Sequence, residues 1–236
     1  MNFDLQENIF RLLLAIPAFV IAFTVHEFAH AWMGYRCGDD TAKRMGRLTL
    51  DPVSHLDPFG SLMFVISSLV GFGIGWAKPV PFNPRNLRHP RRDSLLIAVA
   101  GPVSNLLQVP FWGLSLAALT FAVGRGNPNF QYEIWGALIG QTSPNMSLPV
   151  LMGVVLANGV IVNIMLAAFN MLPFPPLDGH YILAGLGPPA IEDFFNAIAP
   201  YGFMILIAMS YFGVLSVFLA PFYRYAFQIV SLALRV

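Results

Sequence analysis

The chain has 236 residues, of which 56% are hydrophobic and only 11% are charged. Soluble domains carry about a quarter charged residues, so this composition excludes an ordinary soluble protein and indicates a chain that crosses a membrane several times. The formal net charge is +1, but nine of the thirteen Lys and Arg residues lie between Arg36 and Arg92. Cys37 is the single cysteine, which excludes an intrachain disulfide.

The first predicted membrane span covers residues 9–34. About 20 apolar residues suffice to cross a bilayer, and Arg11 is the only charged residue in the stretch 9–24. Residues 35–58 then form a polar loop with four basic side chains: Arg36, Lys43, Arg44 and Arg47. The positive-inside rule assigns this loop to the cytoplasm, so the first span runs from the outside to the inside.

The inner part of this span contains the sequence HEFAH at residues 26–30. In a helix, His26 and His30 lie one turn apart on the same face, so both imidazoles can bind one metal ion. Glu27 can then reach a water molecule bound to that metal, as in a zinc peptidase. A Glu and two His within a membrane-length apolar run are costly and are functional by default, which argues against chance. The expected site lies roughly 10 Å below the cytoplasmic surface.

The apolar segment at residues 59–76 is barely long enough to span a membrane. It ends in three glycines, which weaken a helix, and prolines follow at 79 and 81. We interpret the segment as short or re-entrant, ending in extended, strand-like backbone over residues 77–83. Extended backbone at membrane depth needs protein or a watery cavity beside it, and its edge can pair with an extended substrate. A short transmembrane helix followed by a loop fits equally well.

A second basic loop at residues 84–93 is also assigned to the cytoplasm. We expect its arginines to contact anionic lipid headgroups, and we expect no nucleic-acid partner because no nucleic-acid motif accompanies them. Further spans are predicted at residues 94–123 and 148–172, with an exterior loop at 124–147 between them. Four asparagines lie along these spans and can form interhelical hydrogen bonds: Asn105, Asn158, Asn163 and Asn170.

The sequence NMLPFPPLDGH at residues 170–180 is the second stretch that contains candidate functional side chains. Its prolines break the helix, and Asp178 is the only acidic residue between Glu133 and Glu192. A carboxylate here is costly to bury unless it is paired or binds a metal. A catalytic zinc needs three protein ligands and an open position for water. Asp178 is the best candidate for the third ligand, because it lies at the inner end of a span, as His30 does.

Two histidines compete with Asp178 for this position. His180 follows it by two residues and could instead hydrogen-bond to a ligand. His55 lies in a loop-like segment, where a histidine is more often part of a turn or the surface. The sequence alone leaves their roles open.

The last predicted span covers residues 200–219. The aromatic stretch at 221–236 is interpreted as an interfacial helix or as part of a further span. The expected fold is therefore an all-α polytopic membrane protein with about four to six transmembrane helices, built as a single domain over residues 1–236.

Three motifs together resemble the site-2 protease family of intramembrane zinc metalloproteases. HEFAH matches the zinc motif of that family, AGPVSN at 100–105 resembles its G-P-x-x-N element, and NMLPFPPLDG at 170–179 resembles its N-x-x-P-x-x-x-x-D-G element. The order and separations of the motifs agree. The resemblance covers residues 9–190 and is greatest to the compact branch of the family, which has no inserted PDZ or CBS domain.

The resemblance implies one zinc ion per chain with three protein ligands: His26, His30 and Asp178. It implies that Glu27 is the general base, that Asn170 lies near the substrate, and that Asn105 is a second candidate for that role. It also implies that the strand-like region at residues 71–82 is a small membrane-associated β-hairpin or sheet near the active site that holds the substrate extended. The implied function is an endopeptidase that cleaves other membrane proteins within or near their transmembrane segments. Its active site is expected toward the cytoplasmic side, and the oligomeric state is not predicted.

Two other functions remain compatible with these residues. A membrane metal-ion transporter could use the same ligands, but it would need polar residues along its whole pathway, and this chain has them only near the cytoplasmic end. A different class of membrane metalloprotease would take its third ligand from a glutamate on a later helix. Glu133 and Glu192 both lie outside the predicted spans, which disfavours that class.

Overall fold

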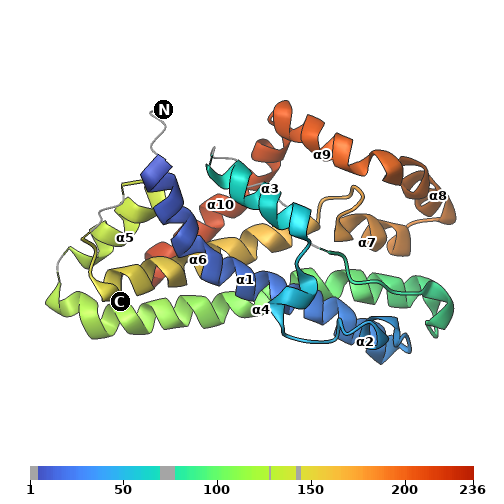
Figure 1. Ribbon diagram of the computed structural model, residues 1–236, viewed down its shortest axis with the longest axis horizontal. Coiled ribbons are helices and arrows are strands. Elements are labelled where there is room, and N and C mark those ends of the chain that lie inside the picture. The colour runs from blue at the N-terminus through green and yellow to red at the C-terminus, as the bar shows by residue number, and fades with distance from the viewer. Residues whose placement is uncertain (1–4, 70–77, 128, 142–144) are drawn as a thin grey trace.

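The computed structural model describes residues 5–69, 78–127, 129–141 and 145–236, and the described chain is predominantly helical (Figure 1). Within these ranges, five helical stretches are long and apolar enough to cross a membrane. They are Gln6–Cys37, Pro90–Val123, Leu148–Asn170, Pro189–Tyr211 and Val214–Ala233. A multi-pass membrane protein is the class that this arrangement defines.

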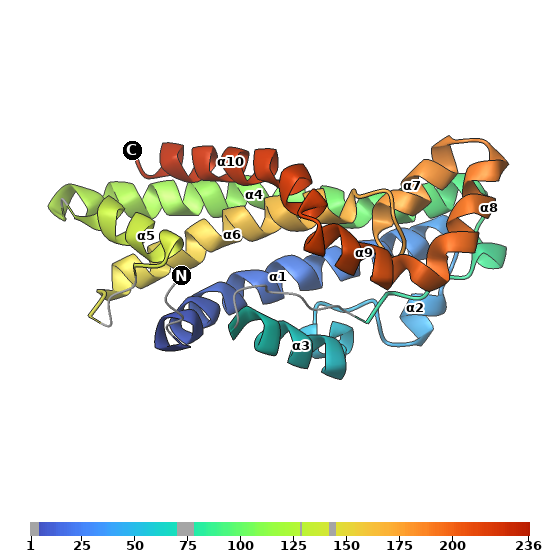
Figure 2. The same ribbon diagram turned by 90° about the horizontal axis from the view of Figure 1, so that it is seen from above.

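Three long helices form the centre of the molecule: α1 (Leu5–Cys37), α4 (Pro90–Val123) and α6 (Leu148–Asn170). They pack against one another along their lengths, and α10 (Val214–Ala233) packs against α4 and α6. Figure 2 shows α1 and α10 on opposite sides of α4 and α6. The core between them is apolar and contains fully buried side chains of Leu116, Val150, Val160 and Val230.

The start of α4 follows from local sequence. Pro90 occupies the first turn, where its missing N–H leaves no hydrogen bond unmade. The Asp93 carboxylate accepts a hydrogen bond from the backbone N–H of His89 at 2.8 Å, which caps the helix. The helix therefore begins four residues before the predicted span at 94–123 and brings its first turns into contact with α7 (Asp178–Leu186).

The region predicted as an exterior loop at 124–147 contains a helix, so that prediction is corrected. After the short 3-10 turn η3 (Gly124–Gly126), α5 (Phe130–Ile139) packs against α6. Phe130, Ile134 and Ala137 are buried at helical spacing and form one apolar stripe. Gly140 ends the helix with a left-handed φ of 96°, which glycine adopts without a steric penalty.

The C-terminal part also differs from the predicted span at 200–219. The chain forms α8 (Pro189–Ile198), the 3-10 turn η4 (Ala199–Tyr201) and α9 (Gly202–Tyr211), and it then turns at Gly213, whose φ is 74°. A continuous helix cannot pass through this left-handed residue. The stretch 221–236, which the sequence left undecided, belongs mostly to α10, a helix long and apolar enough to span.

The segment predicted to be short or re-entrant contains α3 (Pro58–Leu69), which packs against α1. The rings of Phe64 and Phe19 stack there with centroids 4.6 Å apart. The expected β-hairpin is not confirmed, because residues 70–77 lie outside the described ranges and residues 78–83 form no strand. The prolines at 79 and 81 restrict themselves and the residues before them to extended backbone angles, and Asn83 is extended. A single strand-like hydrogen bond runs from the Lys78 N–H to the His55 carbonyl oxygen at 3.1 Å.

Short elements cover the end of the molecule where α1 finishes and α4 begins: α2 (Thr41–Arg44), η1 (Pro52–His55) and η2 (Pro84–Asn86). Asp39 connects α2 to η2. Its buried carboxylate accepts hydrogen bonds from the Thr41 hydroxyl, the Asn86 amide at 2.8 Å and the Asn83 backbone N–H at 2.6 Å. Burial alone would raise the pKa of Asp39, but these hydrogen bonds together lower it below its ordinary value.

Candidate metal centre

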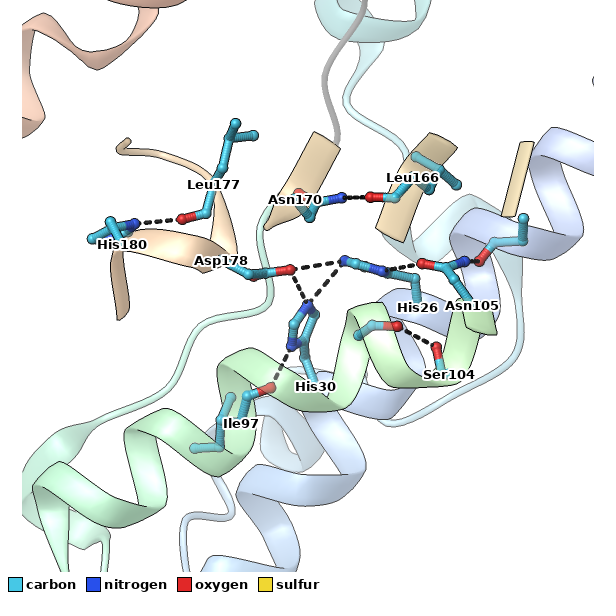
Figure 3. A network of polar contacts seen from close by, with 12 residues as sticks. His26, His30, Ile97, Ser104, Asn105, Leu166, Asn170, Leu177, Asp178 and His180 are labelled. Atoms are coloured by element: carbon cyan, nitrogen blue, oxygen red, sulfur yellow. Dashed lines mark hydrogen bonds and ion pairs between the residues drawn. The ribbon is translucent and has the colours of Figure 1, made fainter. Parts of the chain in front are cut away.

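Three potential ligands from two separate elements converge beside the central helices (Figure 3). His26 and His30 project from α1, and Asp178 is the first residue of α7. The two Nε2 atoms are 3.0 Å apart, and each lies 3.3 Å from Asp178 Oδ2. Both imidazoles are buried, so this group of ligand atoms is largely shielded from solvent.

The ring nitrogens that point away from the cluster are both hydrogen-bonded to oxygen atoms. His30 Nδ1 donates to the Ile97 carbonyl at 2.7 Å, and His26 Nδ1 donates to the Asn105 side-chain carbonyl at 2.6 Å. A carbonyl oxygen only accepts, so Nδ1 carries the proton in both rings. A neutral imidazole with its proton on Nδ1 offers the Nε2 lone pair to a metal ion, and both Nε2 atoms face the Asp178 carboxylate.

The Asn105 side chain is fully buried, and two further hydrogen bonds fix its orientation. Its amide nitrogen donates to the Ala22 carbonyl at 3.1 Å and to the Asn163 side-chain oxygen at 3.0 Å. Asn163 is equally buried and donates to the Gly159 carbonyl at 2.8 Å. These bonds leave the Asn105 oxygen free to accept from His26. Hydrogen bonds from Asn163 on α6 through Asn105 on α4 to His26 on α1 thus place the proton of the His26 ring on Nδ1.

This arrangement fits a zinc ion. Three lone-pair donors within 3.3 Å of one another repel unless a cation lies between them. Among the described residues, Asp178 Oδ2 is a buried oxygen without a hydrogen-bond donor. Ligand atoms about 2.0–2.1 Å from a tetrahedral zinc ion are roughly 3.3 Å apart, close to the observed separations. Two imidazoles and one carboxylate also leave a fourth position open, as a catalytic site requires.

Two glycines allow the elements to approach this closely. A Cβ at Gly101 of α4 would collide with the rings of His26 and His30, so glycine lets α4 pass directly beside the cluster. A Cβ at Gly179 would collide with the carbonyl groups of Met171 and Leu172. Glycine there lets α7 fold back against the end of α6, which brings Asp178 to the histidines.

Glu27 and Asn170 occupy different surroundings. Glu27 is buried on α1 next to His26 in sequence. Asn170 is the last residue of α6, and its amide donates to the Leu166 carbonyl at 3.0 Å. In Figure 3, Asn170 lies above the line between Asp178 and His26. Its second amide hydrogen and its side-chain oxygen make no other hydrogen bond to the described residues.

The two competing histidines lie outside the cluster. His180 donates from Nδ1 to the Leu177 carbonyl, and its ring packs against Tyr181 and Phe195. Burial lowers the pKa of His180 and so favours its neutral form. His55 is fully buried in η1, where Nε2 bonds to the Thr49 carbonyl at 2.9 Å.

Sequence reasoning did not assign a role at the site to Gly101, Asn163 or Arg47. Gly101 lies inside the AGPVSN element, which was the only available signal for it. Asn163 is a polar residue in an apolar span, but its contact with Asn105 depends on how α4 and α6 pack. Nothing in the polar loop distinguishes Arg47 from its neighbours, although the structure buries it.

The class defined by this fold and site is a membrane metalloprotease. The chain belongs to peptidase family M50, the site-2 protease family, whose family profile matches residues 14–209. Zinc is the cofactor that this family and its named members support. The helices and the family together establish an integral multi-pass membrane protein.

Individual relatives agree with this assignment. The chain is 37% identical over 190 residues to the "Putative zinc metalloprotease YwhC" of Bacillus subtilis (strain 168), covering 80% of this chain and 76% of that protein. It is 24% identical over 200 residues to the "Putative zinc metalloprotease Rip2" of Mycolicibacterium smegmatis, covering 84% of this chain and 66% of that protein. The Rip2 protein of Mycobacterium tuberculosis (strain H37Rv) is 27% identical over 208 residues, covering 88% of this chain and 67% of that protein. No solved structure matches the chain significantly.

Proposed function

We propose that the protein is a zinc-dependent intramembrane endopeptidase that hydrolyses peptide bonds within or near the transmembrane segments of other membrane proteins. The observation that carries this proposal is the convergence of the His26, His30 and Asp178 donor atoms beside a membrane-length helix. A protease that acts on soluble proteins has no need to place its metal ligands in such a helix. The ligands and the basic loops around them belong to the same end of the molecule, which supports an active site toward the cytoplasm.

The three ligands would hold the zinc ion, which when bound acidifies water and polarises the scissile carbonyl group. Glu27 follows the first ligand on α1, and as general base it takes the proton from the attacking water. The same carboxyl group then delivers the proton to the departing amide nitrogen. Burial of Glu27 keeps bulk water away from this proton transfer.

The two asparagines receive different roles in this proposal. Asn170 has an uncommitted amide hydrogen near the cluster, which can donate to the substrate carbonyl as negative charge develops on it. All the polar groups of Asn105 are occupied by His26, Ala22 and Asn163. We therefore propose that Asn105 orients His26 and does not contact the substrate, in place of the role that the resemblance implied.

A transmembrane substrate must unwind locally, because a helix keeps its peptide groups in internal hydrogen bonds. The extended segment at 78–83 offers a compensating surface. Pro79 and Pro81 have no N–H, and the peptide groups of Val80 and Phe82 make no hydrogen bond to the described residues. An extended substrate can pair with such an unpaired edge.

Cleavage of a defined single-span membrane protein by the purified full-length chain in liposomes tests the proposal, with the cut located by mass spectrometry of the products. The expected result is a zinc-dependent cut within the span or within a few residues of it. Cleavage confined to soluble loops far from the span would contradict an intramembrane activity. Zinc uptake into the liposomes without any cleavage would instead favour a metal transporter.

A further inference from the structure

Arg47 is buried although it lies in the polar loop between α2 and η1. Only 3% of its surface is exposed to solvent. Arginine is almost never fully buried unless its charge is paired or its donors are satisfied. Arg44, the last residue of α2, behaves as expected for the surface, because it is exposed and pairs with Asp40 at 2.8 Å. The burial of Arg47 therefore needs a specific cause.

The guanidinium of Arg47 binds the backbone carbonyl groups of residues 78 and 79. One nitrogen donates to the Lys78 carbonyl at 2.6 Å, and the other donates to the Pro79 carbonyl at 3.3 Å. The nitrogen that binds Lys78 also lies 3.4 Å from His55 Nδ1. The planar fork of arginine suits such a two-point contact better than the single ammonium group of lysine.

His55 takes part in the same contact between two loops, and we call the contacts of Arg47 and His55 with residues 78–79 the joint. Its Nε2–H donates to the Thr49 carbonyl at 2.9 Å, which leaves Nδ1 free to accept from Arg47. The His55 backbone carbonyl accepts from the Lys78 N–H at 3.1 Å. Residues 78–79 are thus held by both a side chain and a main chain.

The joint lies against the helix face that carries the proposed general base. The His55 ring meets the edge of Phe23 with centroids 6.4 Å apart. Phe23 and Glu27 are one turn apart on α1 and share a face. Burial lowers the pKa of Arg47 below its usual range, and the negative charge of Glu27 offsets only part of this shift.

The segment that Arg47 holds then continues to the third metal ligand. The ring of Phe82 contacts Tyr181 of α7 with centroids 5.6 Å apart, one turn beyond Asp178. The next residue, Asn83, is fixed by the Asp39 carboxylate, which accepts from its N–H at 2.6 Å. Residues 78–83 are therefore extended between two anchors, Arg47 at one end and Asp39 at the other.

Stability alone does not explain the first anchor. Among the described residues, Arg47 Nε is a buried donor without a partner, and such a donor costs free energy. A buried charged group is frequently less favourable than an apolar side chain of similar size. The arrangement is better explained if the position of residues 78–79 matters for function.

We propose that Arg47 is a positioning residue: its guanidinium fixes the backbone at residues 78–79, so that the extended segment 78–82 stays beside the metal centre and presents its unpaired peptide groups to the substrate. This inference rests on the proposed function and names the residue on which substrate alignment depends. Because Arg47 lies in a loop and the metal ligands lie on the helices α1 and α7, its replacement should leave the zinc site intact.

Hydrogen exchange of the intact protein tests the anchor without any substrate. Residues 78–83 contain only four backbone N–H groups, and those of Lys78 and Asn83 are hydrogen-bonded to His55 and Asp39. In Arg47→Gln, exchange at Lys78 should accelerate roughly ten- to a hundredfold, the effect of losing a hydrogen bond to a charged group. Exchange at Asn83 should not change, because Asp39 still holds it. Arg44→Gln is the matched control and should leave both sites unchanged.

Cleavage kinetics of the same variants test the functional consequence. Arg47→Gln should bind zinc as the wild type does and should raise KM for a single-span substrate roughly tenfold or more, with a smaller change in kcat. Arg47→Lys keeps the charge but not the fork, so it should resemble Arg47→Gln. Full recovery by lysine would show that charge alone suffices and would overturn the proposal.

The outcomes separate this proposal from the proposed function. Unchanged exchange at Lys78 in Arg47→Gln would overturn the anchor even if the protein cleaves its substrate. Faster exchange at Lys78 with unchanged KM would show a joint that only supports the fold, which also overturns the positioning role. An inactive wild type with normal zinc content would count against the proposed function, while the exchange result would still decide whether Arg47 anchors the segment.

Discussion

The side chain of Asp178 decides whether the two histidines on α1 form a complete metal site. Its Oδ2 atom is 3.3 Å from both Nε2 atoms, and no other acidic side chain belongs to this cluster in the described part of the chain. Replacing the hydrogen-bond partner of a metal ligand lowers metal affinity roughly ten- to a hundredfold. Asp178→Asn changes a ligand itself, so it should lower zinc affinity by more than that. Zinc content after dialysis against a chelator measures this effect.

Glu192→Gln provides the matched control, because Glu192 is an exposed acidic residue on α8. It should keep its zinc. Loss of zinc from Glu192→Gln but not from Asp178→Asn would indicate the other class of membrane metalloprotease, in which a later glutamate is the third ligand.

Asn163 has a smaller effect that is transmitted through Asn105. Asn163→Ala removes the acceptor that fixes the Asn105 amide, and the orientation of His26 then loses its support. Zinc affinity should fall roughly ten- to a hundredfold while the helical content stays constant. Competition with a fluorescent chelator gives the affinity. Asn158→Ala is the control on the same helix, since the one side-chain hydrogen bond of Asn158 within the described ranges goes to the Leu14 carbonyl at 3.4 Å. Equal losses in both variants would argue against the relay.

At the level of helices, the close approach of α4 to α1 depends on Gly101. Gly101→Ala adds a methyl group that meets both imidazoles, so the rings must move. Misplacement of catalytic groups by about 1 Å can reduce activity on the order of a hundredfold. Alanine also favours a helix more than glycine does, so helical content measured by circular dichroism should not fall.

Gly113→Ala is the control for this change within α4. A Cβ at Gly113 meets the nearest atom, a methyl carbon of Ile229, at an ordinary contact distance of 3.7 Å. Activity should remain near that of the wild type. Equal inactivation of both variants would show that α4 tolerates no added methyl group, and the specific role of Gly101 would be lost.

Local spacing explains what the sequence could predict about these elements. His26 and His30 are close because any helix brings i and i+4 together, and the proline-rich stretch before Asp178 marked the end of α6. The hydrogen bonds of Asn105 and the burial of Arg47 could not be predicted, because they depend on contacts between distant segments. The break at Gly213 was missed because the apolar sequence continues through it and one glycine is a weak signal within an apolar run.

The helix α5 was missed for a related reason. Its apolar stripe is only three residues long and is flanked by glycine, proline and asparagine, which indicate a loop. Its burial against α6 supplies the stabilisation that its short sequence does not. The assignment of zinc was possible because one short motif, HEFAH, contains two of the three donor side chains. The role of each ligand is a prediction that the variants above test.

At the level of the whole molecule, the charge distribution predicts how the protein lies in the membrane. In a protein whose Cys37 is replaced by alanine, Arg85→Cys and Tyr132→Cys place single thiols at exposed positions near opposite ends. In right-side-out vesicles, an impermeant maleimide should label the Tyr132→Cys protein directly. It should label the Arg85→Cys protein only after the vesicles are permeabilised. The reverse pattern would place the metal centre toward the exterior.

The central claim is that the cluster on α1 and α7 holds a zinc ion for hydrolysis, with Glu27 as the base. Its most direct test compares the wild type with Glu27→Gln in one preparation, by measuring zinc content and cleavage of a single-span substrate together. We expect both proteins to hold one zinc ion per chain and only the wild type to cleave, with the mutant slower by roughly a hundredfold or more. Cleavage by Glu27→Gln at the wild-type rate, with zinc retained, would contradict the account.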